Sequence, residues 1–195
     1  MKIFLFNAPP GAGKDTAALE MADYFGNTKV VKFAAPLKKG AAALYLNGDD
    51  DLFAKYDAPD QKDIPSPVFF GKTPRQVQIE LSERFLKLQH GTSVFGDILM
   101  NTLNQMVADN VEAVFISDSG FRPEAEVLVK AFGAENVILV RIKREGYDFS
   151  NDSRSYIDLD DLGVQTFDVE NPNNDRGTFY NRVREIVAHK LGETK

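Results

Sequence analysis

The sequence lacks cysteine and tryptophan, has only two histidines, and contains no long apolar run. Without cysteine the chain has neither a disulfide framework nor a thiol nucleophile, which fits a reducing compartment. His90 and His189 alone do not predict a zinc site. The apolar run at residues 2–6 is too short for a signal-peptide core, and no later stretch approaches a membrane span. We therefore expect a cytoplasmic protein with no membrane partner.

Excess positive charge is also missing, because the formal net charge is −6. This value argues against a non-specific DNA-binding surface, although a local basic patch can still exist within an acidic total. A chain of 195 residues predicts a single domain over 1–195. A chain of this length buries roughly 70% of its unfolded surface, so its core needs no covalent reinforcement.

What the sequence does contain is an alternation of short apolar runs and helical patterns. The runs that predict strands are 2–6, 29–33, 113–117, 136–142 and 164–169. The patterns that predict helices are 14–25, 36–46, 75–88, 94–110, 123–132 and 178–191. Such alternation predicts an α/β fold, with about five parallel strands covered by helices on both faces.

Three segments between these elements differ in character. Residues 47–72 are rich in Asp, Pro and Gly and predict an irregular surface excursion. In the helix that follows, Val77, Leu81, Phe85 and Leu88 predict an apolar stripe. Residues 143–161 are charged and lack apolar periodicity. Ligands of parallel sheets bind outside the carboxyl ends of the strands, so residues 7–14, 118–122 and 144 onward should converge there.

The motif NAPPGAGKDT, at residues 7–16, lies between the first strand and the first helix. Gly11 and Gly13 allow backbone N–H groups to wrap phosphate oxygens, and the helix N-terminus adds positive potential. Lys14 would supply a charge to the β- and γ-phosphates. Ala8 and Asp15 depart from the strict P-loop pattern, which has Gly and Ser or Thr at these positions. An ordinary strand-to-helix turn is the alternative to a phosphate site.

The segment APPGAGKDT resembles the P-loop of nucleoside monophosphate kinases, and its GKDT ending resembles bacteriophage deoxynucleoside monophosphate kinases. Further segments are similar to that family in the expected order: FAAPLK (33–38), GKTPRQ (71–76), ISDSGFRPEAE (116–126), RxxREG (141–146) and DSR (152–154). The resemblance spans most of the chain and covers 47–70 poorly. It implies a P-loop kinase three-layer sandwich with a substrate-binding helical region at 34–110 and a small lid at 143–161.

The resemblance also implies roles for individual residues in an ATP- and Mg²⁺-dependent enzyme. The residues expected to bind ATP are Pro10, Gly11, Ala12, Gly13, Lys14, Asp15 and Thr16. Thr16 and Asp118 are expected to hold the metal or its waters. Lys14, Arg144 and Arg154 are the expected catalytic residues, since lid arginines close over the transferring phosphate. A solvated charged loop is the alternative for the two arginines.

The acceptor is expected to be a deoxynucleoside monophosphate that becomes the diphosphate. The candidate acceptor-binding residues are Lys38, Arg75, Arg84, Phe95, Asp118 and Arg122. Phe95 could equally belong to the core, and Arg84 could pair with Glu80 at i−4. Family members carry Asp-x-Arg-Phe where this chain has Asp118-Ser119-Gly120-Phe121-Arg122, which leaves the acceptor open.

Other acceptors and other functions therefore remain as alternatives. The first alternative is a DNA-modification enzyme, a kinase acting on the hydroxymethyl group of 5-hydroxymethyluracil in phage DNA. Dephospho-coenzyme A and a sugar-like acceptor carry lower weight. A regulatory P-loop protein that binds NTP without kinase activity is the alternative from another class. A phage source, with the host cytoplasm as location, rests on the resemblance alone, and a homodimer is left open.

Overall fold

The computed structural model describes residues 1–150 and 152–192. The chain divides into two compact units: Met1–Phe33 with Gly96–Lys195, and Ala34–Phe95. The helical region predicted at 34–110 is thus split, since residues from Gly96 onward belong to the first unit. Within the described residues, every helix is too short or too polar to cross a bilayer.

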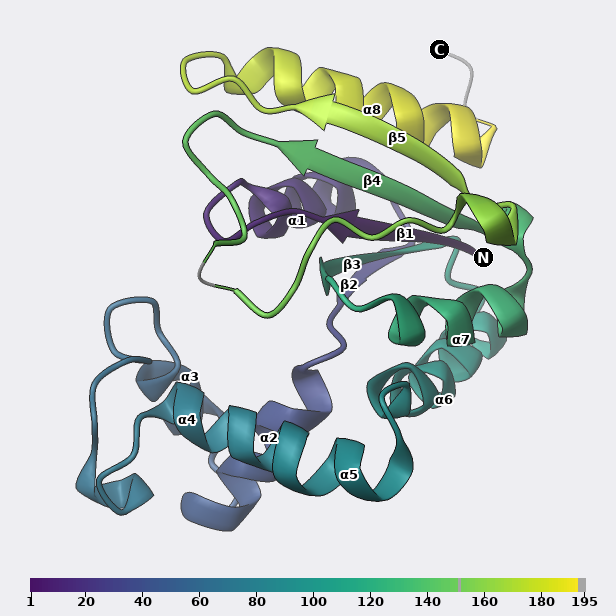
Figure 1. The fold of residues 1–195 in the computed structure, drawn as a ribbon. Helices are drawn as coiled ribbons and strands as arrows, with labels where there is room; N and C mark the ends of the chain where they lie inside the picture. Colours follow the sequence, from purple (N-terminus) through teal and green to yellow (C-terminus); the bar gives the residue numbers. More distant parts are fainter. Residues whose placement is uncertain (151, 193–195) are drawn as a thin grey trace. The chain divides into compact units, whose positions relative to one another are not determined.

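The first unit is built on a five-stranded sheet of order β2-β3-β1-β4-β5, in which every pairing is parallel (Figure 1). The strands are β1 (Lys2–Asn7), β2 (Thr28–Val31), β3 (Ala113–Ser119), β4 (Val137–Lys143) and β5 (Gln165–Glu170). Each predicted strand is present, with ends displaced by one or two residues. The predicted five-stranded parallel sheet is confirmed.

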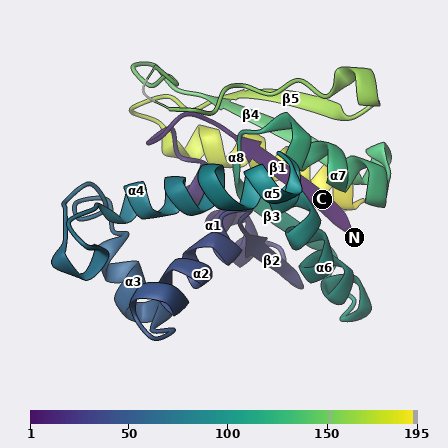
Figure 2. The same ribbon diagram turned by 60° about the horizontal axis from the view of Figure 1, so that its bottom comes forward.

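Helices cover both faces of this sheet. Helices α1 (Lys14–Tyr24) and α8 (Arg176–Leu191) lie on one face, whereas α6 (Val94–Ala108) and α7 (Arg122–Phe132) lie on the other (Figures 1 and 2). Short 3₁₀ turns, η3 (Ala134–Asn136) and η4 (Asp160–Leu162), precede β4 and β5. The prediction of an α/β sandwich with helices on both faces is confirmed.

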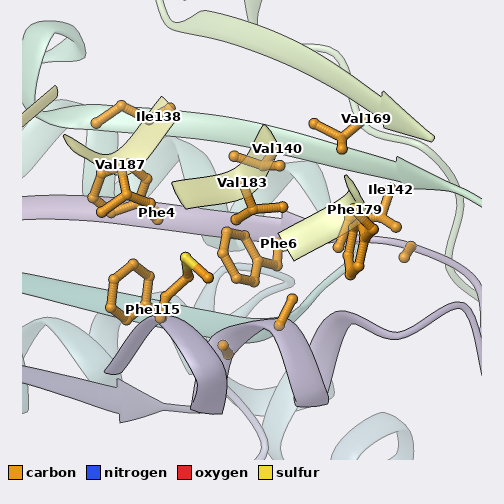
Figure 3. Packing of buried hydrophobic residues seen from close by; sticks show 14 of the residues in the cluster. Phe4, Phe6, Phe115, Ile138, Val140, Ile142, Val169, Phe179, Val183 and Val187 are labelled. Atoms are coloured by element: carbon orange, nitrogen blue, oxygen red, sulfur yellow. The ribbon is translucent and has the colours of Figure 1, made fainter. Parts of the chain in front are cut away.

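The core beneath α1 and α8 is aromatic and aliphatic. Phe4 and Phe6 of β1 pack against Phe115 of β3, with ring centroids 5.3 and 5.8 Å apart. Figure 3 shows these rings together with two isoleucines and a valine of β4 and with Phe179 and Val183 of α8. The apolar run of β1 is buried on both faces, as expected for the central strand of a parallel sheet. This rigid strand leads directly into the glycine loop.

The second unit is helical. Its elements are α2 (Ala35–Tyr45), α3 (Asp50–Tyr56), η1 (Pro67–Phe69), α4 (Pro74–Ile79), the π-helix η2 (Glu80–Leu86) and α5 (Lys87–His90). The segment 47–72, predicted as an irregular surface excursion, contains α3 and η1 and is otherwise mostly in turns and bends, so the prediction is wrong for these two elements. Asp49 caps α3 by accepting a hydrogen bond from the Leu52 N–H at 2.8 Å, and two further aspartates favour the first turn. Phe53 and Phe69 from this segment form the core of the unit.

The predicted apolar stripe from Val77 to Leu88 is also wrong over its second half. Val77 is buried, but Phe85 and Leu88 are 56% and 72% exposed. The reason is η2, because a π-helix has wider turns than an α-helix and shifts every later side chain around the axis. A stripe drawn at α-helical spacing cannot continue through such a segment.

Candidate active site at the glycine loop

The loop between β1 and α1 has the backbone of a phosphate-binding turn. Gly11 and Gly13 have φ of +77° and +103°, values that L side chains rarely adopt. Gly13 is the N-cap of α1 and has no side chain to satisfy the first-turn N–H groups. These donors and the positive end of the helix dipole therefore face the loop, where an anion would be stabilised.

Lys14 is a buried cation inside this turn. The residue is 6% exposed, and its Nζ donates to the Pro9 carbonyl at 3.3 Å. Burial, followed by the positive charge of Arg154, lowers the pKa of Lys14 below its ordinary value. A desolvated ammonium beside a second cation gains free energy when an anion binds, which suits a polyphosphate ligand.

Asp15, the residue that breaks the strict motif, is tied to two other elements. Its Oδ1 accepts hydrogen bonds from Lys32 Nζ at 2.5 Å and from Ser117 Oγ at 2.9 Å. Burial alone would raise the pKa of Asp15, but the hydrogen bonds and charge of Lys32 outweigh it and hold the pKa below its usual range. Asp15 thus joins α1 to the ends of β2 and β3. Thr16 lies exposed on the first turn of α1.

Asp118, near the end of β3, also contacts the end of β2. Its Oδ1 accepts a hydrogen bond from the Phe33 N–H at 2.9 Å. Asp15, Asp118 and Asp152 are the acidic groups whose charges act on Lys14. Carboxylate oxygens are what Mg²⁺ prefers, but residues 1–150 and 152–192 contain no cluster of three or more His, Asp or Glu arranged as a metal site.

Arg144 and Tyr147, from the segment after β4, rest against the loop. Arg144 Nη1 donates to the Gly11 carbonyl at 3.1 Å, and its Nε donates to Asn173 Oδ1 at 2.8 Å. The guanidinium lies 4.6 Å from the centroid of the Tyr147 ring. That ring covers Gly11 so closely that a Cβ there would come within 2.6 Å of it. The segment beyond β4 is therefore in direct contact with the glycine loop.

Arg154 approaches Lys14 from the same segment. Its guanidinium forms an ion pair with Asp152, and its Nε donates to Asp152 Oδ1 at 2.8 Å. The hydrogen bond from Arg154 holds the pKa of Asp152 below its usual range. The aliphatic stem of Arg154 lies on Gly120, where a Cβ would come within 2.5 Å of it. The structure thus brings Lys14, Arg144 and Arg154 to one end of the sheet, as their positions after β1 and β4 predict.

Two asparagines that sequence reasoning missed hold the loop in place. Asn171, which follows β5, donates its Nδ2–H to the Ala12 carbonyl at 2.8 Å. Asn7, the last residue of β1, is fully buried and bonds to the end of β3 and to residues beyond β4. Asn7 is the first residue of the motif NAPPGAGKDT, and a polar residue ending a buried strand is the one signal that could have drawn attention to its side chain.

The four cationic acceptor candidates are all engaged in ion pairs. In the second unit Lys38 pairs with Asp57, Arg75 with Asp63, and the largely exposed Arg84 with Glu80 at 3.9 Å. Phe95 is 4% exposed. In the first unit Arg122 pairs with Glu126 and Asp161 and also donates to the Asp158 carbonyl. Acceptor roles for these residues and for Asp118 stay predictions.

Comparison with known proteins gives one relative along most of the chain. No protein-family model matches the sequence. The chain is 28% identical over 196 residues to the "Putative deoxynucleotide monophosphate kinase" of Acanthamoeba polyphaga mimivirus, with 91% of each protein covered. Among solved structures, dephospho-CoA kinase from Campylobacter jejuni is 15% identical, with a TM-score of 0.45 over the full length of both chains. The mimivirus protein confirms that the resemblance to a deoxynucleotide kinase extends beyond the short motifs.

Proposed function

We propose that the protein is a P-loop kinase that uses ATP and Mg²⁺ to phosphorylate a deoxynucleoside monophosphate, giving the diphosphate. One observation carries the proposal. Lys14 is buried in a glycine loop at a helix N-terminus, the charge of Arg154 acts on it, and Arg144 donates to the Gly11 carbonyl of the same loop. The similarity to a protein named as a deoxynucleotide monophosphate kinase supports the choice of acceptor.

Phosphoryl transfer requires the protein to position the two substrates and to neutralise the charge of the phosphates. The first-turn N–H groups of α1 and Lys14 would hold the β- and γ-phosphates of ATP. Arg144 and Arg154 would stabilise the charge that develops on the transferring group and exclude water from it. The bond from the γ-phosphorus to the bridging oxygen of ATP breaks, and a phosphate oxygen of the acceptor forms the new bond. ADP leaves with the bridging oxygen.

Mg²⁺, when bound, would neutralise part of the charge on the phosphates. Asp118 and Thr16 are the proposed contacts to the ion or its waters. Asp15 is the third oxygen donor of the loop, and its position is fixed by Lys32 and Ser117. A carboxylate at the place of the usual hydroxyl keeps an oxygen available to the metal or its waters.

Acceptor recognition is proposed for the cations of the second unit and for Arg122. Lys38 and Arg75 each carry an acidic partner that a phosphate could displace. Both side chains are at least partly exposed, so water screens their present ion pairs and weakens them. An incoming phosphate therefore faces a small cost in replacing these carboxylates.

A coupled assay of ADP formation with ATP and each deoxynucleoside monophosphate tests the proposal. We expect at least one acceptor to stimulate ADP formation strongly above the ATP-only background, and the Lys14→Met variant to abolish this stimulation. Slow ATP turnover that no acceptor stimulates would instead indicate a P-loop protein without kinase activity. Transfer of label only to hydroxymethyluracil-containing DNA would place the acceptor in nucleic acid. Either result would overturn the proposed acceptor.

A further inference from the structure

We propose that Asn7, together with Gly120, positions Arg154 against Lys14. Asn7 is the last residue of β1, and the glycine loop that leads to Lys14 follows it. Arg154 belongs to the long connection between β4 and β5, which Figure 1 shows returning across the sheet in front of β1. Apart from η4, the described residues of this connection form no strand or helix. Specific contacts are therefore needed to fix one of its side chains, and these two residues supply them.

The amide of Asn7 makes three hydrogen bonds, which use both its donors and its acceptor. Nδ2 donates to the Ser119 carbonyl at 2.9 Å and to the Ser155 carbonyl at 3.0 Å. Oδ1 accepts from the Ile157 N–H at 2.9 Å. The side chain thus links the ends of β1 and β3 to the backbone on the C-terminal side of Arg154. The bonds to Ser119 and Ile157 are buried and that to Ser155 is partly buried, and the Asn7 side of each is shielded from water because Asn7 is 0% exposed.

Gly120 provides the second contact, on the side chain of Arg154 itself. A Cβ built at Gly120 would lie 2.5 Å from both Cγ and Cδ of Arg154 and 2.7 Å from its Cβ. Because the Cβ of Arg154 is fixed by the backbone, a methyl group at Gly120 would move the residue and not merely its tip. Asn7 therefore holds the backbone that follows Arg154, at Ser155 and Ile157, and Gly120 lies against the stem of Arg154.

This placement matters because Arg154 acts on Lys14 electrostatically, and Asp152 fixes the guanidinium from the other side. Asn7 touches neither the loop glycines nor Lys14 in any described hydrogen bond, so its effect on the reaction passes through Arg154. Asn7 and Gly120 are accordingly positioning residues. The kinetic part of this inference rests on the proposed kinase function.

A double-mutant cycle separates positioning from general stability. We expect Asn7→Ala to lower kcat on the order of 10- to 100-fold, the size of loss that small displacements of a positioned group produce. In the Arg154→Ala background the same change should lower kcat less than twofold further. Equal losses in both backgrounds would show that Asn7 acts on the whole fold and would overturn the inference. Gly120→Ala should behave as Asn7→Ala does, and it preserves the buried amide should Asn7→Ala fail to fold.

Limited trypsin digestion gives a readout that needs no kinase activity. Cleavage after Arg154 should be slow in the wild-type protein and faster in Asn7→Ala and Gly120→Ala. The matched control is Asn136→Ala, which removes a part-buried amide bond to the Phe132 carbonyl at the opposite end of β4. Unchanged cleavage after Arg154 in both test variants, or equal acceleration in Asn136→Ala, would overturn the inference. If the wild-type protein shows no transfer activity, only the proposed function is refuted. The digestion result still decides whether Asn7 and Gly120 position Arg154.

Discussion

Replacing Gly13 with alanine tests whether the loop backbone has the shape on which the account depends. Gly13 has φ +103°, and a Cβ at this position would lie 2.6 Å from Nδ2 of Asn171. That nitrogen donates to the Ala12 carbonyl at 2.8 Å. The substitution therefore does two things at once: it places an L side chain in the left-handed region, and it displaces the amide that braces the loop.

The size of the effect follows from these two terms. A left-handed backbone costs an L residue about 1–2 kcal/mol. Losing the Asn171 bond and leaving a buried carbonyl unsatisfied costs about 1–3 kcal/mol. Since the terms overlap when the loop relaxes, we expect Gly13→Ala to lower the free energy of unfolding by about 2–4 kcal/mol. This is a large share of the roughly 5–15 kcal/mol by which proteins are stable.

Urea denaturation measures this loss, with Gly26→Ala as the matched control. Gly26 belongs to the same unit, has no atom within 4 Å of a built Cβ and has no left-handed φ. The control should therefore gain about 0.4–1 kcal/mol through the unfolded state. The double variant Gly13→Ala/Asn171→Ala should lose less than the sum of the single variants, because both remove the same bond. A Gly13→Ala protein as stable as the wild type would refute the loop geometry.

Three further predictions concern charged residues of the site. Lys14→Met should lower kcat/KM for ATP by about 10²–10³-fold, by analogy with loss of one preorganised donor. The control Lys29→Met, at an exposed position of β2, should leave kcat/KM unchanged. An equal loss in both variants would contradict a specific role for Lys14. Arg144→Lys should raise the KM for ATP nearly as much as Arg144→Ala does. The reason is that an ammonium keeps the charge but cannot reproduce the paired contacts to the Gly11 carbonyl and Asn173. Full activity of the lysine variant would show that charge alone suffices. The hydrogen bond from Arg154 lowers the pKa of Asp152 in the folded state. This pair therefore stabilises the fold at pH values above the unfolded-state pKa of about 3.9, and the contribution is lost as the pH falls below that value. Asp152→Asn should accordingly flatten the decline of the urea midpoint below pH 4, and a decline as steep as that of the wild type would exclude this contribution.

The sheet and the convergence of its loops could be predicted because both follow from local pattern. Short apolar runs alternating with helical periodicity indicate parallel strands with crossover helices. Once the strands are parallel, the residues after β1, β3 and β4 must meet at the carboxyl edge. Arg144 reaching Gly11 is a direct consequence of this geometry.

The second unit resisted prediction because its order comes from capping and from tertiary packing. Asp49 caps a seven-residue helix in a segment whose Asp and Pro content suggests a loop. A helix this short gains little from propensity and depends on the burial of Phe53. The π-helix over Glu80–Leu86 changes the side-chain period, which no α-helical template anticipates.

Within the site, the sequence indicated which residues matter but not their partners. The place of Asp15 at the start of α1 follows from the motif. Its contacts with Lys32 and Ser117 depend on residues 17 and 102 positions away. The brace from Asn171 spans 159 positions. Contacts of this range arise only when the strands are assembled, so a single sequence does not reveal them.

Transfer of the γ-phosphoryl group of labelled ATP to a deoxynucleoside monophosphate tests the central claim most directly. We expect label to appear in the deoxynucleoside diphosphate, to require Mg²⁺, and to fall by orders of magnitude in Arg154→Ala while ATP affinity is preserved. Label found only in inorganic phosphate, with every deoxynucleoside monophosphate tried, would contradict the claim that this glycine loop serves a nucleotide kinase.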